Sequence, residues 1–218
     1  MHPESNLRHD SARVLPLASA SRLTAAERAR FEAYLAEILY ALGLDASSSD
    51  TRDTPARLLG AWIDATSGYA TDPKLVTTFP CERGEGERGD CAQIVEGPIP
   101  FTALCEHHAL PFFGRAWLGY IADARLIGLS KLTRVVRQFS RRFTMQERVG
   151  REIAACLDAL VQPRGVAVRI EAAHLCTRMR GVLESEAVTA STTWRGAYEA
   201  DSSLRREFLE LCVAGAGR

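Results

Sequence analysis

The stretch VAVRIEAAHLC, residues 166–176, decides the expected fold class. Apolar residues alternate along its first part, which is typical of a β-strand with one face in the core. These apolar residues are Val166, Val168 and Ile170. If the strand continues past residue 173, His174 and Cys176 share one of its faces. The stretch therefore predicts a strand that ends near two side chains of metal-ligating types, His174 and Cys176.

Two helices are expected near the N-terminus. Thr24 and Glu27 form a capping box before an apolar repeat of helical spacing that stops at Gly43. Thr54-Pro55, an N-cap with proline in the first turn, begins the second helix. The residues expected to form the apolar faces of the two helices are Phe31, Leu35, Ile38, Leu39, Leu42, Leu58, Leu59, Trp62 and Ile63.

Two strands and two more helices are expected before residue 166. The strands cover residues 91–101 and 112–121, and their prolines limit them to sheet edges or strand ends. The first helix has Ser130 as its N-cap. Thr144 and Glu147 form a capping box that opens the second helix.

The order of elements indicates the fold class. A last strand at about 182–194 and a short helix near 203–212 complete the order helix, helix, strand, strand, helix, helix, strand, strand, helix. Because this order lacks the regular strand–helix–strand alternation of a parallel sheet, we expect an α+β fold with antiparallel strands. Residues 1–22 are polar without a sustained period and are expected to be disordered, whereas residues 23–218 are expected to form one domain.

The composition is that of an ordinary globular protein. Lysine plus arginine (27) balances aspartate plus glutamate (27), so any anion site must come from local clustering of charge. No apolar run reaches the roughly 18 residues of a membrane span. The six cysteines show no tight framework spacing, and VLPLASA (14–20) makes a poor signal-peptide core. We therefore expect a cytoplasmic protein that binds neither nucleic acid nor membrane.

Two clusters of cysteine and histidine form a candidate metal site. In LCEHHAL (104–110), Cys105 and His108 can converge only if the chain turns between them. Together with Cys176 they offer two thiolates and one imidazole, a set that suits zinc and leaves the open position of a catalytic site. Each cysteine taken singly is more simply explained as a small buried apolar side chain. The residues alone leave both interpretations open.

The neighbouring histidines are candidates for proton transfer. If His108 is a ligand, the adjacent His107 points elsewhere, and His107 and His174 could act as general acid–base groups near neutral pH. Each could also be a core or surface histidine with a satisfied hydrogen bond. Glu106 could orient a metal ligand, or it could be a plain exposed carboxylate.

A cluster of seven cations lies between residues 131 and 151. Lys131 and Arg134 follow Ser130 in the first turn of a helix, where cations oppose the helix dipole and free N–H groups favour a phosphate. This mismatch predicts an anionic ligand, and Arg178 or Arg180 could bind phosphate beside the metal. The cations expected to form a plain solvated face are Arg137, Arg141 and Arg142.

Glu147 has two competing interpretations. Locally it fits the third helical position of the Thr144 capping box, which is the simpler role. It could instead accept hydrogen bonds from the N1–H and 2-amino groups of a guanine.

Four segments together resemble the GTP cyclohydrolase I family. They are LCEHHALPFFG, IGLSKLTRVVRQFSRR, MQERVGREI and EAAHLCTRMRGV, in the family's order and separations, and DTPARL (53–58) is similar to its upstream helix. The resemblance covers roughly residues 24–212 and favours zinc over the core interpretation. It implies a tunnelling fold, an antiparallel sheet with helices packed on one side, at about 90–214, after a helical part at about 23–70.

The resemblance also implies an activity, an assembly and residue roles. Members use one Zn2+ per subunit to convert GTP to 7,8-dihydroneopterin triphosphate and formate, towards folate or tetrahydrobiopterin, in a homodecamer of two pentamers with active sites between subunits. The implied metal ligands are Cys105, His108 and Cys176. The implied proton-transfer groups are His107 and His174. The implied substrate-binding residues are Ser130, Lys131, Arg134, Gln146, Glu147 and Arg180.

Two departures from the family pattern keep alternatives open. Ala103 stands where a serine usually lies two residues before the metal cysteine. Gly60 replaces a lysine found in some members, which leaves Arg57 to bind phosphate from that helix. The alternatives are a paralogue of the same fold that acts on another purine nucleotide, and a catalytically silent zinc-containing module that binds a pterin or purine.

Overall fold

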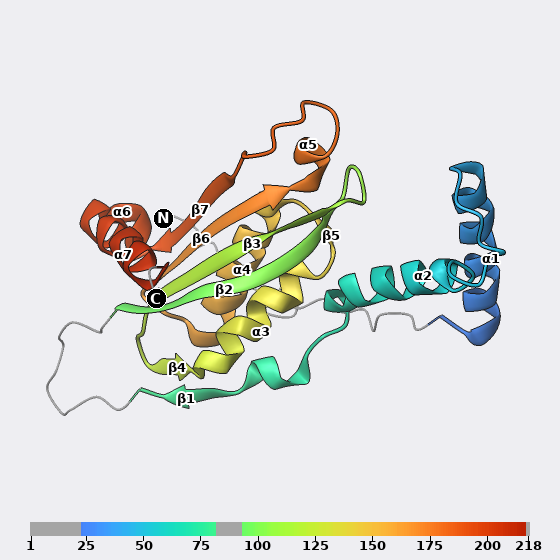
Figure 1. Ribbon diagram of the computed structural model, residues 1–218. Helices are drawn as coiled ribbons and strands as arrows, with labels where there is room; N and C mark the ends of the chain where they lie inside the picture. The colour runs from blue at the N-terminus through green and yellow to red at the C-terminus, as the bar shows by residue number, and fades with distance from the viewer. Residues whose placement is uncertain (1–22, 82–92, 217–218) are drawn as a thin grey trace, which may run out of the picture.

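A computed structural model of the protein describes residues 23–81 and 93–216 (Figure 1). The expectation for residues 1–22 lies outside this part. Among the described residues, no helix has both the length and the apolar character needed to cross a membrane.

A five-stranded sheet in the order β5-β2-β3-β6-β7 forms the centre of the molecule. Neighbouring long strands are antiparallel, and they are β2 (Gln93–Cys105), β3 (Pro111–Ile121), β6 (Gly165–His174) and β7 (Thr189–Gly196). The short β5 (Phe143–Thr144) runs parallel to the end of β2. This arrangement confirms the α+β class with antiparallel strands.

Among the described residues, the outer edge of β2 has a strand partner only at its end. Its partner on one side is β3, whereas β5 pairs only with Leu104 and Cys105 on the other. Pro98 and Pro100 lie in the open part, as expected of residues that cannot donate a hydrogen bond to a sheet. A separate two-stranded sheet pairs β1 (Thr78–Pro80) with β4 (Arg125–Ile127), a pairing that the sequence did not indicate.

Two helices cover one face of the sheet, as expected. They are α3 (Leu129–Ser140) and α4 (Gln146–Val161). The apolar face of α3 is fully buried, and it consists of Leu132, Val135, Val136 and Phe139. Val166, Val168 and Ile170 of β6 face the same core, so their alternation is confirmed. Helices therefore stabilise this face chiefly by burying aliphatic side chains.

The last helices cover one end of the opposite sheet face. α6 (Ala197–Ala200) and α7 (Ser202–Ala216) bring Tyr198 and Phe208 onto a small apolar cluster with Trp117. Gly119 allows this close approach, because a Cβ there would lie 2.7 Å from the Phe208 ring. The last strand begins at Thr189, later than expected, and the last helix is longer than expected.

The helix starts show which capping predictions were right. The capping box of Thr24 and Glu27 is present at the start of α1 (Ala25–Ala41), and the chain leaves that helix at Gly43 with a φ of 97°. α3 begins two residues earlier than expected, with Gly128 rather than Ser130 as N-cap. The Thr144 capping box is wrong, because Thr144 lies in β5, paired with Cys105, and Met145 is the N-cap of α4 without a side-chain hydrogen bond.

Of the two N-terminal helices, α1 stands away from the sheet, whereas α2 (Thr54–Ala65) contacts β2 (Figure 1). α1 packs against α2, whose N-cap is Asp53 rather than Thr54. Two 3-10 turns, Ser67–Tyr69 and Pro73–Val76, lead from α2 to β1. Most of the apolar residues predicted for α1 and α2 are not buried within one chain. Of these residues, only Leu35 and Leu59 are buried. Ile38, Leu42 and Trp62 are among the exposed ones.

Candidate active site

A tight turn after β2 brings the first two ligand candidates together. The backbone N–H of Cys105 donates to the carbonyl of Leu110 at 2.8 Å, and the N–H of Ala109 donates to the carbonyl of Cys105 at 2.8 Å. Ala109 has a φ of 54°, so the chain reverses there in the left-handed region. The predicted bend between Cys105 and His108 is therefore present.

Cys105, His108 and Cys176 form a three-ligand group. Their ligand atoms all lie within 4.8 Å of one another, and Cys105 Sγ is 3.7 Å from His108 Nδ1. Tetrahedral zinc, with Zn–S near 2.3 Å and Zn–N near 2.0 Å, places its ligand atoms about 3.5 to 3.8 Å apart. Two thiols and one imidazole at these separations fit zinc and leave one position open.

Cys176 reaches this group by a different route from the one expected. β6 ends at His174, and Leu175–Arg178 form a single helical turn, α5. The prediction that His174 and Cys176 share a strand face is therefore wrong. The turn instead carries the thiol towards Cys105. Burial, followed by the nearby Cys105, raises the pKa of the Cys176 thiol, and Arg180 acts in the opposite direction. A bound cation would favour the thiolate.

His107 lies beside the metal group without belonging to it. Its Nδ1 is 3.8 Å from Cys105 Sγ, and its ring stands at 70° to that of His108 with the centroids 6.2 Å apart. The side chain is exposed. It is therefore accessible to a substrate that approaches the open metal position.

His174 is held in a defined orientation. Its ring stacks on Phe112, with the centroids 4.7 Å apart and an angle of 3° between the planes. Its Nε2 lies 2.9 Å from Gln146 Oε1. Burial lowers the pKa of His174, while the carboxylate of Glu147 acts in the opposite direction. The neutral imidazole, which can accept a proton, is therefore favoured at neutral pH.

The side chain of Gln146 supports His174 rather than facing outward. Gln146 is almost fully buried, and its amide nitrogen donates to acceptors on β6 and β7. These acceptors are the carbonyls of Ile170 (3.1 Å) and Thr189 (3.0 Å) and the hydroxyl of Ser191 (3.0 Å). Oε1 is left to accept from Nε2–H of His174. Only the backbone N–H of Gln146, at the first helical position, remains for a substrate.

Glu147 has no capping role in the structure. No side chain caps α4, and Glu147 is exposed in its first turn. Its charge acts on His174, which places the carboxylate within electrostatic reach of the metal end of the sheet. The capping interpretation is therefore wrong, and binding of a guanine edge by Glu147 stays a prediction.

The other predicted phosphate-binding residues are divided between two places. Ser130 and Lys131 lie in the first turn of α3. The strand before this helix, β4, lies at the end of β3 that is remote from the metal group, where the N–H of Ile127 donates to Tyr120 Oη at 3.4 Å. Figure 1 shows α5 at the opposite end of the sheet. One chain therefore does not bring these residues to the metal group.

Several predicted cations already have partners within the chain. Arg134 donates to Asp72 at 2.8 Å. Arg178 donates twice to the carbonyl of Ala187, whereas Arg180 is exposed near Cys176.

The expectation that Arg142 is solvated is wrong. It is buried over the Phe139 ring and pairs with Glu152 at 3.7 Å. Arg137 and Arg141 are exposed, as expected. Arg57 is also exposed, and its Nη2 pairs with Asp53 at 3.2 Å.

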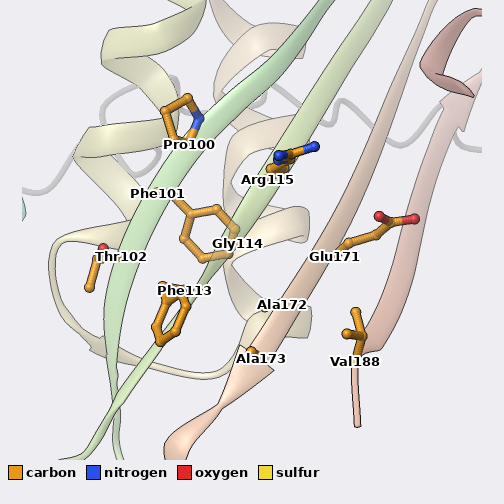
Figure 2. Close-up of a pocket in the computed structure, with 10 residues that line it drawn as sticks. All are labelled: Pro100, Phe101, Thr102, Phe113, Gly114, Arg115, Glu171, Ala172, Ala173 and Val188. Atoms are coloured by element: carbon orange, nitrogen blue, oxygen red, sulfur yellow. The ribbon is translucent and has the colours of Figure 1, made fainter. Parts of the chain in front are cut away.

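One hollow in the described part of the chain belongs to another region (Figure 2). Its volume is about 540 Å³, and it lies on the part of the sheet face that α7 leaves open, beside Phe113, Arg115 and Glu171. None of the three ligands lines it. The hollow is therefore separate from the three-ligand group, which remains the candidate active site.

Comparisons with known proteins identify the family of this chain. The family model for GTP cyclohydrolase I matches residues 31–213. A GTP cyclohydrolase 1 of Mycolicibacterium vanbaalenii is 41% identical over 191 residues, 86% of this chain and 91% of that protein. Proteins of the same name from Porphyromonas gingivalis and Mycobacterium leprae are each 38% identical, over 84% and 88% of this chain and 92% of their own lengths. The chain therefore belongs to the GTP cyclohydrolase I family, with the α+β tunnelling fold expected for it.

Proposed function

We propose that the protein, with one Zn2+ per subunit, hydrolyses and rearranges GTP to 7,8-dihydroneopterin triphosphate and releases formate. The observation that carries this proposal is the convergence of Cys105, His108 and Cys176 beside an oriented His174. A module that only binds a purine has no need of an open metal position next to two histidines that are free to move protons.

The residues around the metal group have different roles in the proposed reaction. Zinc, when bound, would supply Lewis-acid activation of water for attack on guanine C8. His174 is neutral and held through Nε2, so its Nδ1 is free to exchange a proton while the five-membered ring of the guanine opens. His107 is the second proton-transfer group, on the exposed side of the metal.

Recognition of the substrate combines one carboxylate with several cations. Glu147, with the backbone N–H of Gln146, would bind the guanine edge, since its carboxylate is exposed and caps no helix. Lys131 and Arg134, with Ser130, would bind the triphosphate near the start of α3. Arg180 would bind it beside Cys176. Arg134 would have to exchange or share its present partner Asp72.

We further propose a homo-oligomer, a decamer of two pentamers, in which neighbouring subunits complete each site. Support comes from the separation of the metal group and the start of α3 at opposite ends of the sheet. The exposed apolar residues of α1 and α2 and the open edge of β2 offer surfaces for such contacts. Residues 23–218 would act as one domain of a cytoplasmic enzyme that supplies a pterin precursor for folate or a related cofactor.

Product analysis tests the proposed activity. The zinc-loaded protein should release formate from GTP and yield a fluorescent neopterin after oxidation and dephosphorylation. A chelator-treated sample and ATP in place of GTP serve as controls. Absence of formate from GTP, with zinc confirmed at one ion per chain, would overturn the proposal. Formate from another purine nucleotide but not from GTP would identify the paralogue instead.

A further inference from the structure

An ion pair joins the metal turn to α4. The guanidinium of Arg148 donates through both terminal nitrogens to the two carboxylate oxygens of Glu106, with Nη2 3.1 Å from Oε1. The backbone N–H of Glu106 also donates to the carbonyl of Thr144 at 3.2 Å. Paired parallel hydrogen bonds between guanidinium and carboxylate fix relative orientation as well as distance.

The two ends of this ion pair belong to the two halves of the site. Glu106 lies between the ligands Cys105 and His108, in a turn whose other hydrogen bonds are local. Arg148 follows Glu147 on α4, in the turn that also contains Gln146, the partner of His174. Movement of the metal turn relative to α4 would therefore change the spacing between the metal ligands and the groups that face the purine.

We propose that Glu106 and Arg148 are a positioning pair, which sets the metal turn against the first turns of α4. The proposal deepens the proposed function and rests on it for its catalytic part. The pair includes none of the three metal ligands, and it acts through the orientation of Cys105 and His108 relative to the first turns of α4. Residues that support metal ligands typically change metal affinity or activity about 10- to 100-fold when replaced.

A second ion pair on the same helix provides a matched control. Arg195 of β7 pairs with Asp158 of α4 at 3.2 Å, and both side chains are partly exposed, like those of Glu106 and Arg148. Asp158 lies ten residues after Arg148, about three turns further along α4, and its ion-pair partner belongs to β7. A plain surface ion pair contributes little to function or stability, so loss of this pair measures the effect of an ion pair as such.

The experiment compares Glu106→Gln, Arg148→Met and the double variant with Arg195→Met in the full chain. Zinc release to a chelator and the visible spectrum of the Co2+-substituted protein are measured without GTP. We expect about 10- to 100-fold faster zinc release or lower kcat in each Glu106 or Arg148 variant, with KM for GTP and thermal unfolding near the wild-type values. The double variant should lose no more than the more affected single variant, because the two residues act as one unit.

The outcomes separate this proposal from the proposed function. If Glu106→Gln and Arg148→Met match Arg195→Met in zinc release, Co2+ spectrum and kcat, the positioning pair is rejected. Losses that multiply in the double variant would also reject it, because the two residues would then act independently. If the wild type makes no formate, the proposed function fails, while zinc release and the Co2+ spectrum still decide whether the pair positions the metal turn.

Discussion

The two ends of the sheet differ in how completely one chain builds them. At the metal end, three ligands converge, His174 is anchored by Gln146 and stacked on Phe112, and the turn is tied to α4. At the other end, Ser130 is exposed and Lys131 forms no ion pair within the described residues. One chain therefore brings the three candidate ligands together by itself, whereas it leaves the predicted phosphate-binding residues at the start of α3 apart from them. Substitutions at each end of the sheet test this difference.

Loss of a metal ligand should have the largest effect. Cys176→Ala removes one of two thiolates from the three-ligand group, so zinc content and formate release should both fall, the latter at least about 1000-fold. Metal analysis and a formate assay measure the two quantities. Cys156→Ala, a buried thiol outside the group, is the control and should keep its zinc. Full zinc content in Cys176→Ala would contradict the ligand assignment.

Replacement of His107 should separate the metal from the chemistry. His107 lies outside the three-ligand group, so His107→Ala should retain zinc while kcat falls about 100- to 10,000-fold, the range for a lost acid–base group. His108→Ala, measured in parallel, should lose the metal. If His107→Ala loses zinc and His108→Ala keeps it, the roles of the two histidines are reversed.

Mixing two inactive chains should recover activity if the metal group of one subunit meets the start of α3 of a neighbouring subunit. One chain carries Cys176→Ala, and the other carries Lys131→Glu with Arg134→Glu. In randomly mixed oligomers about a quarter of the sites would combine two intact halves. Recovery of formate release after co-expression measures this. No recovery, with mixed oligomers confirmed by differently tagged chains, would show that each chain must supply both halves.

Glu147 should affect substrate binding with little change in stability. Because it caps no helix, Glu147→Gln should change the free energy of unfolding by less than about 0.5 kcal/mol, compared with about 1 kcal/mol for a lost cap. KM for GTP should rise about 10-fold through loss of a charge-assisted hydrogen bond. Chemical denaturation and steady-state kinetics check the two values. A large loss of stability with unchanged KM would restore the capping interpretation.

The two capping boxes show where sequence prediction succeeded and where it failed. Thr24 and Glu27 have only local partners, so their motif produced the predicted cap. Thr144 and Glu147 have the same spacing, but Thr144 pairs with Cys105 across the sheet, and this tertiary contact overrides the local preference.

The same distinction applies to the candidate site. The cysteines and histidines could be proposed from their chemistry alone. The supporting roles of Gln146, Phe112 and Arg148 could not, because their partners lie far away in the sequence and depend on strand register. Alternation along β3 could have placed Phe112 on the core face, but only the observed pairing puts it opposite His174.

The prolines on the open edge of β2 have a consequence for how sheets can add to one another. A backbone without N–H groups at positions 98 and 100 offers an approaching strand carbonyl acceptors but no donors there. A strand can therefore add only in registers that place its own unpaired carbonyls elsewhere, which discourages indiscriminate edge-to-edge aggregation. The edge of β2 therefore favours a neighbouring strand that needs no hydrogen-bond donor opposite residues 98 and 100.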